Sequence, residues 1–525
     1  MHQYLISFLI FTPLCAAALI LLTPTTSSKT FRSLTLLTNI FQCVIVGMIS
    51  VDFSYNSELQ FAEHVPWIRL DLGSWGIFAA DYLVALDGLS MPLVALSVGV
   101  LTIATIASWE TEKNPKGYFC LLLIMNASII GTFVAFDLLL FYLFFEFMLL
   151  PMFFLIGIWG GPKREYASIK FFLYTLLGSV LILVVFIGLY LSYNMSEGEE
   201  LVRSFNLNTF LDSKNIISGS MLAKNQSLIG SFTLSEVAFL LLFIGFAIKL
   251  PIVPLHTWLP DAHVEASTPI SVILAGILLK VGGYGLLRIV CPIFPDAFMA
   301  FSSLLAACGV ISIIYGAFAA LGSQDLKKLI AYSSVSHMGF VLLGIASGTT
   351  EGVAGAVYQM ISHGILSALL FIIAGVIYDR TGDRIITNYS GLQSAMPKFF
   401  VFVLIAFFAS LGLPGFSGFI AEIFVLMGAF KSNSENGLLH IGFAMIATLG
   451  LVLAAGYFLW TIQRMFFGKL NYHGDIRLLT DIKEIEALQM APLAVAAIIF
   501  GILPQLLLNW INPFAINFVD LIFRR

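Results

Sequence analysis

The chain has 525 residues, of which 59% are hydrophobic and only 11% are charged, whereas an average soluble domain carries roughly 25% charged residues. A soluble chain of this length would form two or three domains and would need far more charge to cover their surfaces. The formal net charge of −4 gives no basic surface for DNA or RNA. These numbers exclude a soluble enzyme, a nucleic-acid-binding protein and a disordered scaffold, and they predict an integral membrane protein.

Fourteen apolar stretches are long enough to cross a bilayer as α-helices, which takes about 20 residues each. In chain order they cover 4–22, 32–51, 82–108, 117–136, 138–160, 166–193, 235–260, 268–290, 298–321, 326–346, 352–378, 397–430, 440–463 and 489–511. The first is expected to be a retained span rather than a signal peptide, because residues 1–4 contain no Lys or Arg and no clear cleavage pattern follows. The sequence therefore predicts an all-α polytopic membrane protein with about fourteen transmembrane helices.

The basic residues of the connecting loops predict the orientation. With the loops numbered in order, the odd loops carry 15 Lys and Arg residues, and the even loops and the C-terminal tail carry 7. Because Lys and Arg gather on the cytoplasmic side, the odd loops are expected to face the cytoplasm. Both termini then lie on the outer, periplasmic side of a bacterial cytoplasmic (inner) membrane.

Three long loops differ in character. Residues 52–81 alternate polar and apolar side chains and predict a small hairpin, whereas residues 194–234 are rich in Ser, Asn, Glu and Gly and lack a strong apolar core. Neither loop contains a plausible catalytic constellation. The amphipathic stretch 464–488 is expected to lie along the membrane surface or against a partner.

Two of the predicted spans are interrupted. In the seventh, Lys249 is followed by Pro251, Pro254 and Pro260, and the twelfth contains the run 412–415, Gly-Leu-Pro-Gly. Proline removes a helix hydrogen bond and glycine loosens the backbone, and at membrane depth the freed groups need a cavity or protein partners.

The two interruptions lie five spans apart, which suggests that spans 4–8 are repeated in spans 9–13 with inverted topology, as in many transporters. The expected organisation is an N-terminal part with spans 1–3 (1–116), a first five-helix repeat (117–290), a second five-helix repeat (298–463), and a C-terminal part with the amphipathic segment and span 14 (464–525).

A small set of ionisable residues lies within the apolar stretches, where a charge costs roughly 2.5–3.5 kcal/mol at the bilayer centre. The set consists of Glu146, Lys249, Lys280, His337, His363 and Glu422. A purely structural explanation is that each group only holds helices together through an ion pair or a hydrogen bond. Six such groups, two of them beside broken helices, favour a functional row.

A row of titratable side chains can pass protons through a region where water molecules alone do not form a stable hydrogen-bonded chain. Burial favours the neutral form of a lysine and a nearby carboxylate opposes that preference, so Glu146 is expected to modulate Lys249, with Lys280 as the next station. His337 and His363 can each accept and donate a proton and suit the middle of the relay. Glu422 is then the last station before the outer side.

Other chemistries fit the sequence less well. His337 and His363 form one isolated pair with no other haem signature, and the spacing of His256 and His263 fits no standard zinc motif. No G-x-G-x-x-G opens a helix after a strand, so nothing indicates a dinucleotide site. We therefore predict no redox catalysis and no metal or cofactor site in this chain.

The remaining polar residues of the spans are expected to be structural. No two of the five cysteines are close to each other in the sequence. They are therefore expected to be small hydrophobic core residues. Asp87 and Asp137 lie near the outer ends of spans, and Lys170 and Arg288 are placed so that their head groups can snorkel to the interface.

Several runs of residues resemble the antiporter-like subunits of respiratory complex I and the related Mrp-type cation/proton antiporters. The most specific is 249–269, KLPIVPLHTWLPDAHVEASTP, followed by 280–285, KVGGYG. Further similar runs are 136–147, 333–339, 362–364 and 413–416, so that the resemblance covers essentially the whole chain.

Within that family the chain resembles the M-type (chain M) subunits of proton-pumping NADH:quinone oxidoreductase. Glu422 stands where the L-type and N-type subunits typically place a Lys, and no long lateral helix follows the fourteenth span. The resemblance implies a proton channel through the six intramembrane residues, coupled to quinone reduction elsewhere. It also implies that NAD, FMN, iron–sulfur clusters and quinone bind to partner subunits, with L-type and N-type subunits and the lipid bilayer as neighbours.

Three alternatives remain open at this point. The chain is also compatible with an Mrp-type subunit that exchanges Na⁺ for H⁺, with an antiporter-like subunit of a membrane-bound hydrogenase, or with a structural membrane subunit.

Overall fold

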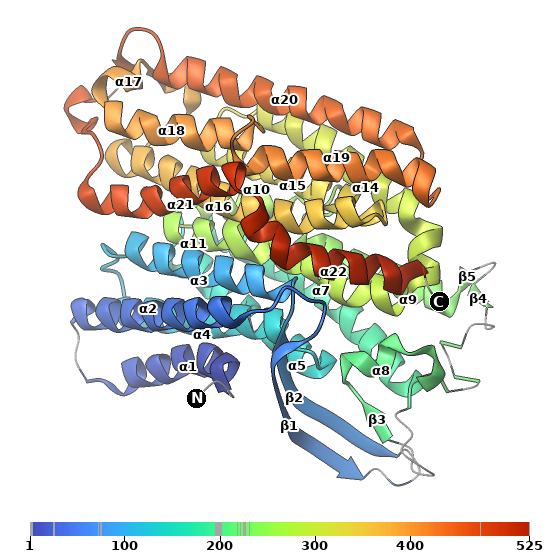
Figure 1. The fold of residues 1–525 in the computed structure, drawn as a ribbon. Helices are drawn as coiled ribbons and strands as arrows, with labels where there is room; N and C mark the ends of the chain where they lie inside the picture. Colours follow the sequence, from blue (N-terminus) through green and yellow to red (C-terminus); the bar gives the residue numbers. More distant parts are fainter. Residues whose placement is uncertain are drawn as a thin grey trace.

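The computed structural model describes residues 4–24, 27–71, 73, 76–194, 202–217, 219–220, 222–223, 227–229, 232–472 and 474–523. They form a bundle of roughly aligned helices with a three-stranded sheet at one end (Figure 1). We call this end the hairpin end and the other, where α17 (Leu392–Ala395) lies, the opposite end. Residues 1–3, 195–201 and 524–525, which entered the expectations for the termini and for loop 194–234, lie outside the described residues.

The N-terminal part contains three long helices and a β-hairpin. Its elements are α1 (Leu5–Leu22), α2 (Ser28–Asp52), β1 (Gln60–Asp71), β2 (Ile77–Leu86) and α3 (Ser90–Ala107). The predicted hairpin is confirmed, but the predicted start of the third span at residue 82 is wrong, because β2 pairs with β1 as far as Leu86. The carboxylate of Asp87 accepts hydrogen bonds from the N–H groups of Leu89 and Ser90, and this cap starts the helix only there.

The first five-span group follows. Its helices are α4 (Pro115–Val134), α5 (Leu138–Phe147), α6 (Leu149–Trp159), α7 (Arg164–Ser192), α9 (Leu234–Lys249), α10 (Trp258–Glu265), α11 (Thr268–Ile273), α12 (Leu279–Gly285) and α13 (Cys291–Ile293). The last three form one buried span with π-helical turns at Leu274–Leu278 and Leu286–Val290, which the sequence did not indicate. The seventh span is broken between α9 and α10, as predicted from its prolines.

The long connection before α9 lies against the hairpin. It contains β3 (Val202–Ser204), α8 (Leu207–Leu211), β4 (Ser227–Ile229) and β5 (Phe232–Thr233). Strand β3 pairs in parallel with β2, and Phe205 accepts the N–H of Leu138 at the start of α5. The hairpin is therefore joined to the first group through this connection.

The second five-span group consists of longer helices. They are α14 (Pro295–Leu321), α15 (Leu326–Ala346), α16 (Thr350–Thr381), α18 (Pro397–Ser410), α19 (Ser417–Glu435) and α20 (Ile441–Phe466). The twelfth span is broken between α18 and α19, as predicted, and Gly412 and Gly415 adopt positive φ angles of 77° and 98° there. Helices α14, α15, α16 and α19 pack against one another in sequence, and α16 also packs against α11 of the first group.

The chain ends in two helices rather than one. The predicted fourteenth span is present as α21 (Glu484–Ile502), but its predicted end at residue 511 is wrong, because a separate helix, α22 (Gln505–Phe523), follows after Pro504. Pro504 has no N–H to continue the first helix. Helix α22 crosses the hairpin end of the bundle, where Trp510 contacts Phe53 and Phe518 contacts Phe298.

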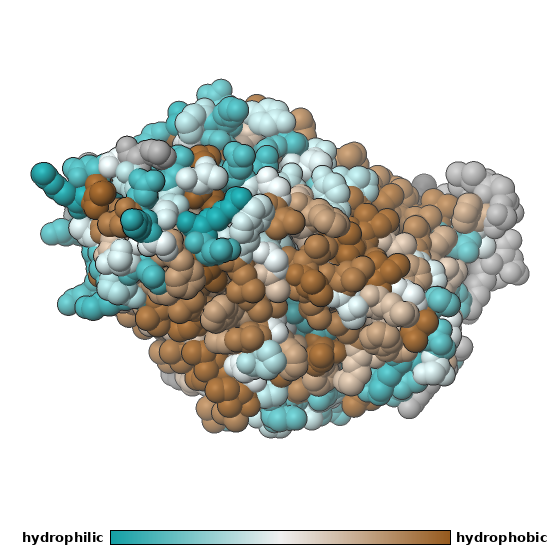
Figure 2. Space-filling model, turned by 90° about the horizontal axis from the view of Figure 1, so that it is seen from above, coloured by the Kyte–Doolittle hydropathy of each residue, from teal (hydrophilic) through white to brown (hydrophobic). Residues whose placement is uncertain are grey.

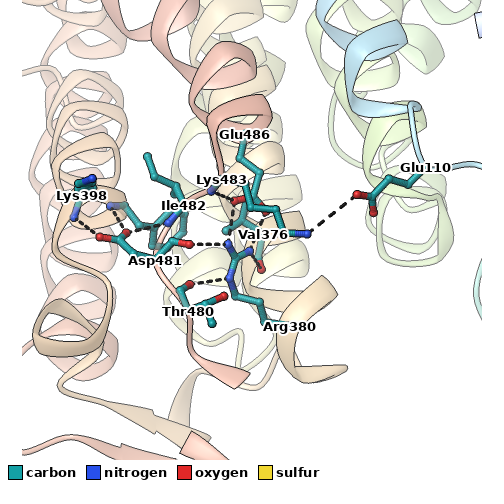
Figure 3. A network of polar contacts seen from close by, with 10 residues as sticks. Glu110, Val376, Arg380, Lys398, Thr480, Asp481, Ile482, Lys483 and Glu486 are labelled. Carbon is teal, nitrogen blue, oxygen red and sulfur yellow. Dashed lines mark hydrogen bonds and ion pairs between the residues drawn. The ribbon is translucent and has the colours of Figure 1, made fainter. Parts of the chain in front are cut away.

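The segment between α20 and α21 is held against the chain's own helices at the opposite end. It pairs β7 (Asn471–Tyr472) with β6 (Tyr389–Ser390). Figure 3 shows Arg380 of α16 in two hydrogen bonds of 2.7 and 2.9 Å to Glu486, while it also donates to the carbonyls of Thr480 and Asp481. The predicted amphipathic stretch 464–488 is thus the end of α20, an anchored loop and the first turn of α21.

The apolar helices and the distribution of hydrophobic residues on the surface are those expected of a membrane protein. Among the described residues, thirteen helices are long and apolar enough to cross a membrane. The two broken spans are not among them because their pieces are shorter or more polar, while α22 meets the criterion although it lies across the bundle end. Figure 2 shows hydrophobic residues over the middle of the molecule and hydrophilic residues gathered toward the opposite end, at the left.

Candidate functional site

Lys280 lies at the centre of the bundle on α12. Its side chain is fully buried, and Nζ donates a hydrogen bond to the carbonyl of Ala275. Ala275 belongs to a π-helical turn, in which the regular hydrogen-bond ladder is shifted. On its other side Nζ lies 2.8 Å from Nδ1 of His363 on α16. Lys280 therefore joins the first five-span group directly to the second.

Two further groups extend this contact within the second group. The rings of His363 and His337 meet edge to face with centroids 5.4 Å apart. Nε2 of His337 lies 3.8 Å from Oε1 of Glu422, and all three side chains are buried. The structure thus brings four of the six predicted residues into one row: Lys280, His363, His337 and Glu422.

Lys249 occupies the last position of α9, immediately before the break. Pro251 ends the helix because it has no N–H to donate. The buried Nζ donates to the carbonyl of Phe145 at 3.3 Å and lies 3.0 Å from the centroid of the Phe145 ring. A cavity of about 10 Å³ adjoins Lys249 and Trp258, which is close to the smallest space that holds one water molecule.

Glu146 on α5 is placed differently from the other five residues. It is half-buried, and the neighbouring Phe147 and Leu150 are 57% and 53% exposed, so this face of the bundle is apolar. Oε1 of Glu146 is buried and has no hydrogen-bond partner. A carboxylate in an apolar face needs a covering partner, because isolated charges are costly in lipid.

Glycine allows the two lysine-bearing helices to approach closely. A Cβ at Gly282 would lie 2.5 Å from the backbone nitrogen of Leu250, and a Cβ at Gly285 would overlap the ring of Phe246. Small residues at helix crossings are the usual means of close packing in membranes. This crossing fixes the relative positions of Lys249 and Lys280.

The two broken spans are also tied to the second group. In the seventh, the N–H of Val253 donates to Oγ of Ser312 on α14 at 3.0 Å, which satisfies one of the freed backbone groups. In the twelfth, Ser417 at the start of α19 lies 2.8 Å from Ser362, the neighbour of His363. The interruptions therefore provide polar contacts at membrane depth.

Several charged residues lie where the sequence did not place them. Arg288 is not a snorkelling residue: its guanidinium is buried and donates to Asp87 at 2.5 Å. Lys327, one of the 15 basic residues assigned to the odd loops, is 2% exposed and donates to the carbonyl of Ala266. Lys170 forms an ion pair of 2.7 Å with Asp261. These pairs join residues far apart in the chain, so spacing alone could not reveal them.

Asp137 has the structural role that was expected. Its carboxylate caps α5 by accepting the N–H groups of Leu139 and Leu140, and it also accepts the N–H of Asp81 on β2. Burial raises the pKa of Asp137 to about 6, although these three hydrogen bonds favour the ionised form. The cap fixes the start of the helix that carries Glu146.

The geometry of the histidines bears on the metal and haem alternatives. The edge-to-face contact of His337 and His363 leaves no space for a porphyrin between the rings. His256 and His263 are buried, their ring nitrogens have no hydrogen-bond partner, and His263 stacks on Phe371 at 4.4 Å. Within the part of the chain that the structure describes, no three His, Cys, Asp or Glu residues are grouped closely enough to hold a metal ion.

Fold and site together define a polytopic membrane protein with a row of ionisable side chains inside its bundle. A protein family described as NADH:quinone oxidoreductase/Mrp antiporter, transmembrane, matches residues 135–451. The NADH-quinone oxidoreductase subunit M of Rhodobacter capsulatus is 37% identical over 527 residues, which cover 99% of this chain and 97% of the relative. The chain belongs to this family, and the resemblance to M-type antiporter-like subunits is confirmed.

Solved structures agree with this assignment. A chain of respiratory complex I from Thermus thermophilus with bound NADH superposes with a TM-score of 0.82 at 28% identity, covering 99% of this chain and 100% of that one. A chain of the Mrp complex from Dietzia sp. DQ12-45-1b gives a TM-score of 0.80 at 20% identity, with 99% and 98% covered, and shares the fold.

Proposed function

We propose that this chain is a proton-translocating membrane subunit of an NADH:quinone oxidoreductase. The observation that carries the proposal is the 2.8 Å contact between Lys280 and His363, which connects ionisable groups of the two five-span groups inside the membrane. A row of titratable groups at such depth is costly unless it serves transport.

The proton path runs through five of the six predicted residues, and the sixth, Glu146, acts on the first of them. Protons enter near the broken seventh span at Lys249, pass to Lys280, and move through His363 and His337 to Glu422. Each histidine can accept a proton on one ring nitrogen and release one from the other. The twelfth span, broken beside Glu422, supplies the polar backbone for release. No direct bond joins Lys249 to Lys280, so water or a side-chain rotation completes that step.

Energy and redox chemistry come from partner subunits in this proposal. NAD, FMN, iron–sulfur clusters and quinone bind there, and electron transfer changes the electrostatic balance of the relay from outside. Half-buried Glu146, beside the exposed Phe147 and Leu150, marks the face where a neighbouring membrane subunit, of the L-type or N-type, covers the chain and sets the charge felt by Lys249.

The chain is placed in a bacterial inner membrane with both termini on the outer side. The basic loops lie at the opposite end of the bundle, which then faces the cytoplasm. The domain organisation follows the spans: an N-terminal part (1–116), two inverted five-helix repeats (117–290 and 298–463), and a C-terminal part (464–525). The interruptions in the fourth span of each group support the repeat.

The test replaces relay residues in the assembled complex. Lys249→Met and Glu422→Gln are expected to reduce NADH-driven acidification of inverted membrane vesicles at least about tenfold, since loss of a proton-transfer group commonly costs 10²–10⁴-fold in rate. Lys170→Met, which removes a membrane-helix lysine outside the row, is the matched control and retains pumping. Wild-type pumping in both relay variants overturns the proposal.

The same vesicles separate the Na⁺/H⁺ antiporter alternative. Proton movement that requires Na⁺, and that continues without NADH when a Na⁺ gradient is imposed, would assign the chain to the Mrp-type function. Copurification with nickel–iron subunits would assign it to a hydrogenase.

A further inference from the structure

Four buried polar residues at the hairpin end of the first five-span group take no part in the relay. Arg288 donates from Nη2 to Asp87 at 2.5 Å and to Ser90 at 3.3 Å, and from Nε to the hydroxyl of Tyr284 at 3.3 Å. The Tyr284 hydroxyl in turn donates to the carbonyl of Phe133 at 3.1 Å. The cluster links α3, α4 and the eighth span.

The cluster lies directly outward of Lys280. Lys280, Tyr284 and Arg288 follow one another at intervals of four residues, so they share one face of the same span. At a rise of 1.5 Å per residue Arg288 is about 12 Å from Lys280 along the helix. Beyond Arg288 lies a pocket of about 190 Å³ at the hairpin end, lined by Arg288 and Asp87. Arg288 thus stands between the relay and this pocket.

Aromatic rings enclose the guanidinium. It lies 4.6 Å from the ring of Phe136, 5.4 Å from that of Tyr284 and 5.4 Å from that of Phe514 on α22. Aromatic faces stabilise a cation and leave little room for water. The positive charge is therefore retained in a low-dielectric surrounding, where its field is strong.

Asp87 keeps the pair ionised. Burial alone would raise the pKa of Asp87, but the guanidinium of Arg288 and the N–H groups of Ser90 and Leu89 lower it below its ordinary value. Arginine itself stays protonated at all physiological pH values. The carboxylate of the cluster consequently has a low affinity for a proton arriving from Lys280.

The hairpin end of the second group is built differently. There the side chain of Asn436 donates to the carbonyls of Ser347 and Gly348 and accepts the hydroxyl of Ser432 at 2.8 Å. Ser347 also lies 3.0 Å from the hydroxyl of Thr349. Hydroxyl and amide groups can exchange hydrogen bonds with water. The cation of this end, Lys431, is 41% exposed and pairs with Glu351 and Glu435, so it is not enclosed in the bundle as Arg288 is.

We propose that Arg288, held by Asp87, is an electrostatic barrier that closes the first five-span group to protons at the hairpin end. Protons that reach Lys280 then leave only through His363 and the second group. A fixed positive charge excludes protons from a narrow polar path, as arginines do in other selective pores. This inference rests on the proposed function and adds the residue that gives the path its direction.

The test measures passive proton leak through the intact complex in liposomes without NADH, driven by a K⁺ diffusion potential. Arg288→Gln is expected to raise the leak several-fold, while Arg288→Lys, which keeps the charge, does not. Asp87→Asn removes the same ion pair but leaves the cation, so the leak stays low. A merely structural pair would make Arg288→Gln and Asp87→Asn equally leaky, and that result overturns the inference.

Two double variants complete the design. Lys280→Met added to Arg288→Gln is expected to return the leak to the wild-type value, because the opened path passes through Lys280; a persistent leak would mean general damage and would contradict the barrier. Asp87→Asn combined with Arg288→Gln leaves two neutral amides in place of the ion pair. This double variant replaces Arg288→Gln in the leak measurement if the single variant does not assemble. If this assembled complex does not leak, the inference is wrong.

The proposed function and the barrier at Arg288 can be tested independently of each other. Normal pumping by the Lys280→Met single variant would contradict the relay itself. Lost pumping in Lys280→Met together with a tight Arg288→Gln complex would contradict only the barrier.

Discussion

The two five-span groups share a plan and differ in their chemistry at matching places. In the first, the ionisable residue of the broken span is a lysine that ends the helix before the break; in the second, it is a glutamate in the helix after the break. At the hairpin end the first group has a buried arginine–aspartate pair, whereas the second has hydroxyl and amide groups and a partly exposed Lys431–Glu351 pair. Cationic groups therefore dominate one half of the row, and imidazole and carboxyl groups the other.

This difference explains how one fold can give a path a direction. Lysine releases a proton readily when burial disfavours its charge, and glutamate accepts one for the same reason. The histidines between them carry both a donor and an acceptor in the neutral state. Two identical halves would offer no such sequence of sites.

The largest expected effect comes from breaking the contact between the halves. His363→Phe preserves an aromatic ring but removes the nitrogen that lies 2.8 Å from Lys280, so NADH-driven pumping should fall at least about tenfold, within the range for lost proton-transfer groups. His440→Gln, on a histidine that caps α20 outside the row, is the control. Fluorescence quenching of a pH dye in vesicles measures both, and equal pumping in the two variants would show that the halves do not communicate here.

A second variant pair makes the second group resemble the first. Asn436→Lys adds a cation among the hydroxyl groups of its hairpin end, where Lys431 is already paired with Glu351, and pumping is expected to slow several-fold, about 1 kcal/mol in barrier height. Asn436→Asp loses the same amide but introduces the opposite charge, and its pumping should exceed that of the Lys variant. Initial acidification rates decide the matter, and a reversed order of the two variants would refute the contrast between the ends.

A third substitution tests the packing that holds the first group's lysines. Gly282→Val adds side-chain atoms at a position where the Cβ alone would lie 2.5 Å from the backbone nitrogen of Leu250. Overpacking of this kind costs about 1–3 kcal/mol. We expect a lower melting temperature of the purified complex. Gly456→Val on α20 has open space around it and should leave the melting temperature unchanged. Equal stability of the two variants would argue against a tight crossing of α9 and α12.

The smallest effect concerns the opposite end of the second group. Asp481 accepts the N–H groups of Lys398 and Phe399, and although burial acts to raise its pKa, these bonds lower it below the ordinary value. Its contribution to stability is present above the unfolded-state pKa and is lost as pH falls through the lower folded-state pKa. Asp481→Asn should therefore lower the melting temperature slightly at pH 6–8, and this difference should shrink as the pH falls through the folded-state pKa of Asp481. A difference that grows on acidification would contradict this sign.

The sequence predicted the spans well because their apolar length is a direct requirement of the bilayer. It also predicted both helix breaks, since proline and glycine act locally. The position of α22 was missed although Leu503-Pro504 marks the break, because the apolar composition continues across it. A lone proline inside an apolar run does not by itself show whether the chain bends or ends a helix.

The row itself was only partly predictable. Ionisable residues in apolar runs identified Lys280, His363, His337 and Glu422, but not which helix faces they occupy. Glu146 lies toward an outer face of the chain. The sequence could not show this, because a helix that is apolar all round gives no indication of its rotation. The Asp87–Arg288 pair joins residues 201 positions apart, and only the packed helices reveal it.

Helix α22 sets a limit on how the protein can move. It seats Phe514 against Arg288 of the first group and places Phe523 beside Gly348 of the second, while Val253 is bonded to Ser312 across the same divide. Alternating-access transporters rock one bundle against the other around a bulky solute. Such rocking would break the contacts of α22 with both groups. Proton transfer, in contrast, needs only rotations of side chains and rearrangement of water. The architecture therefore suits a carrier of the smallest cation, which never requires the two halves to part.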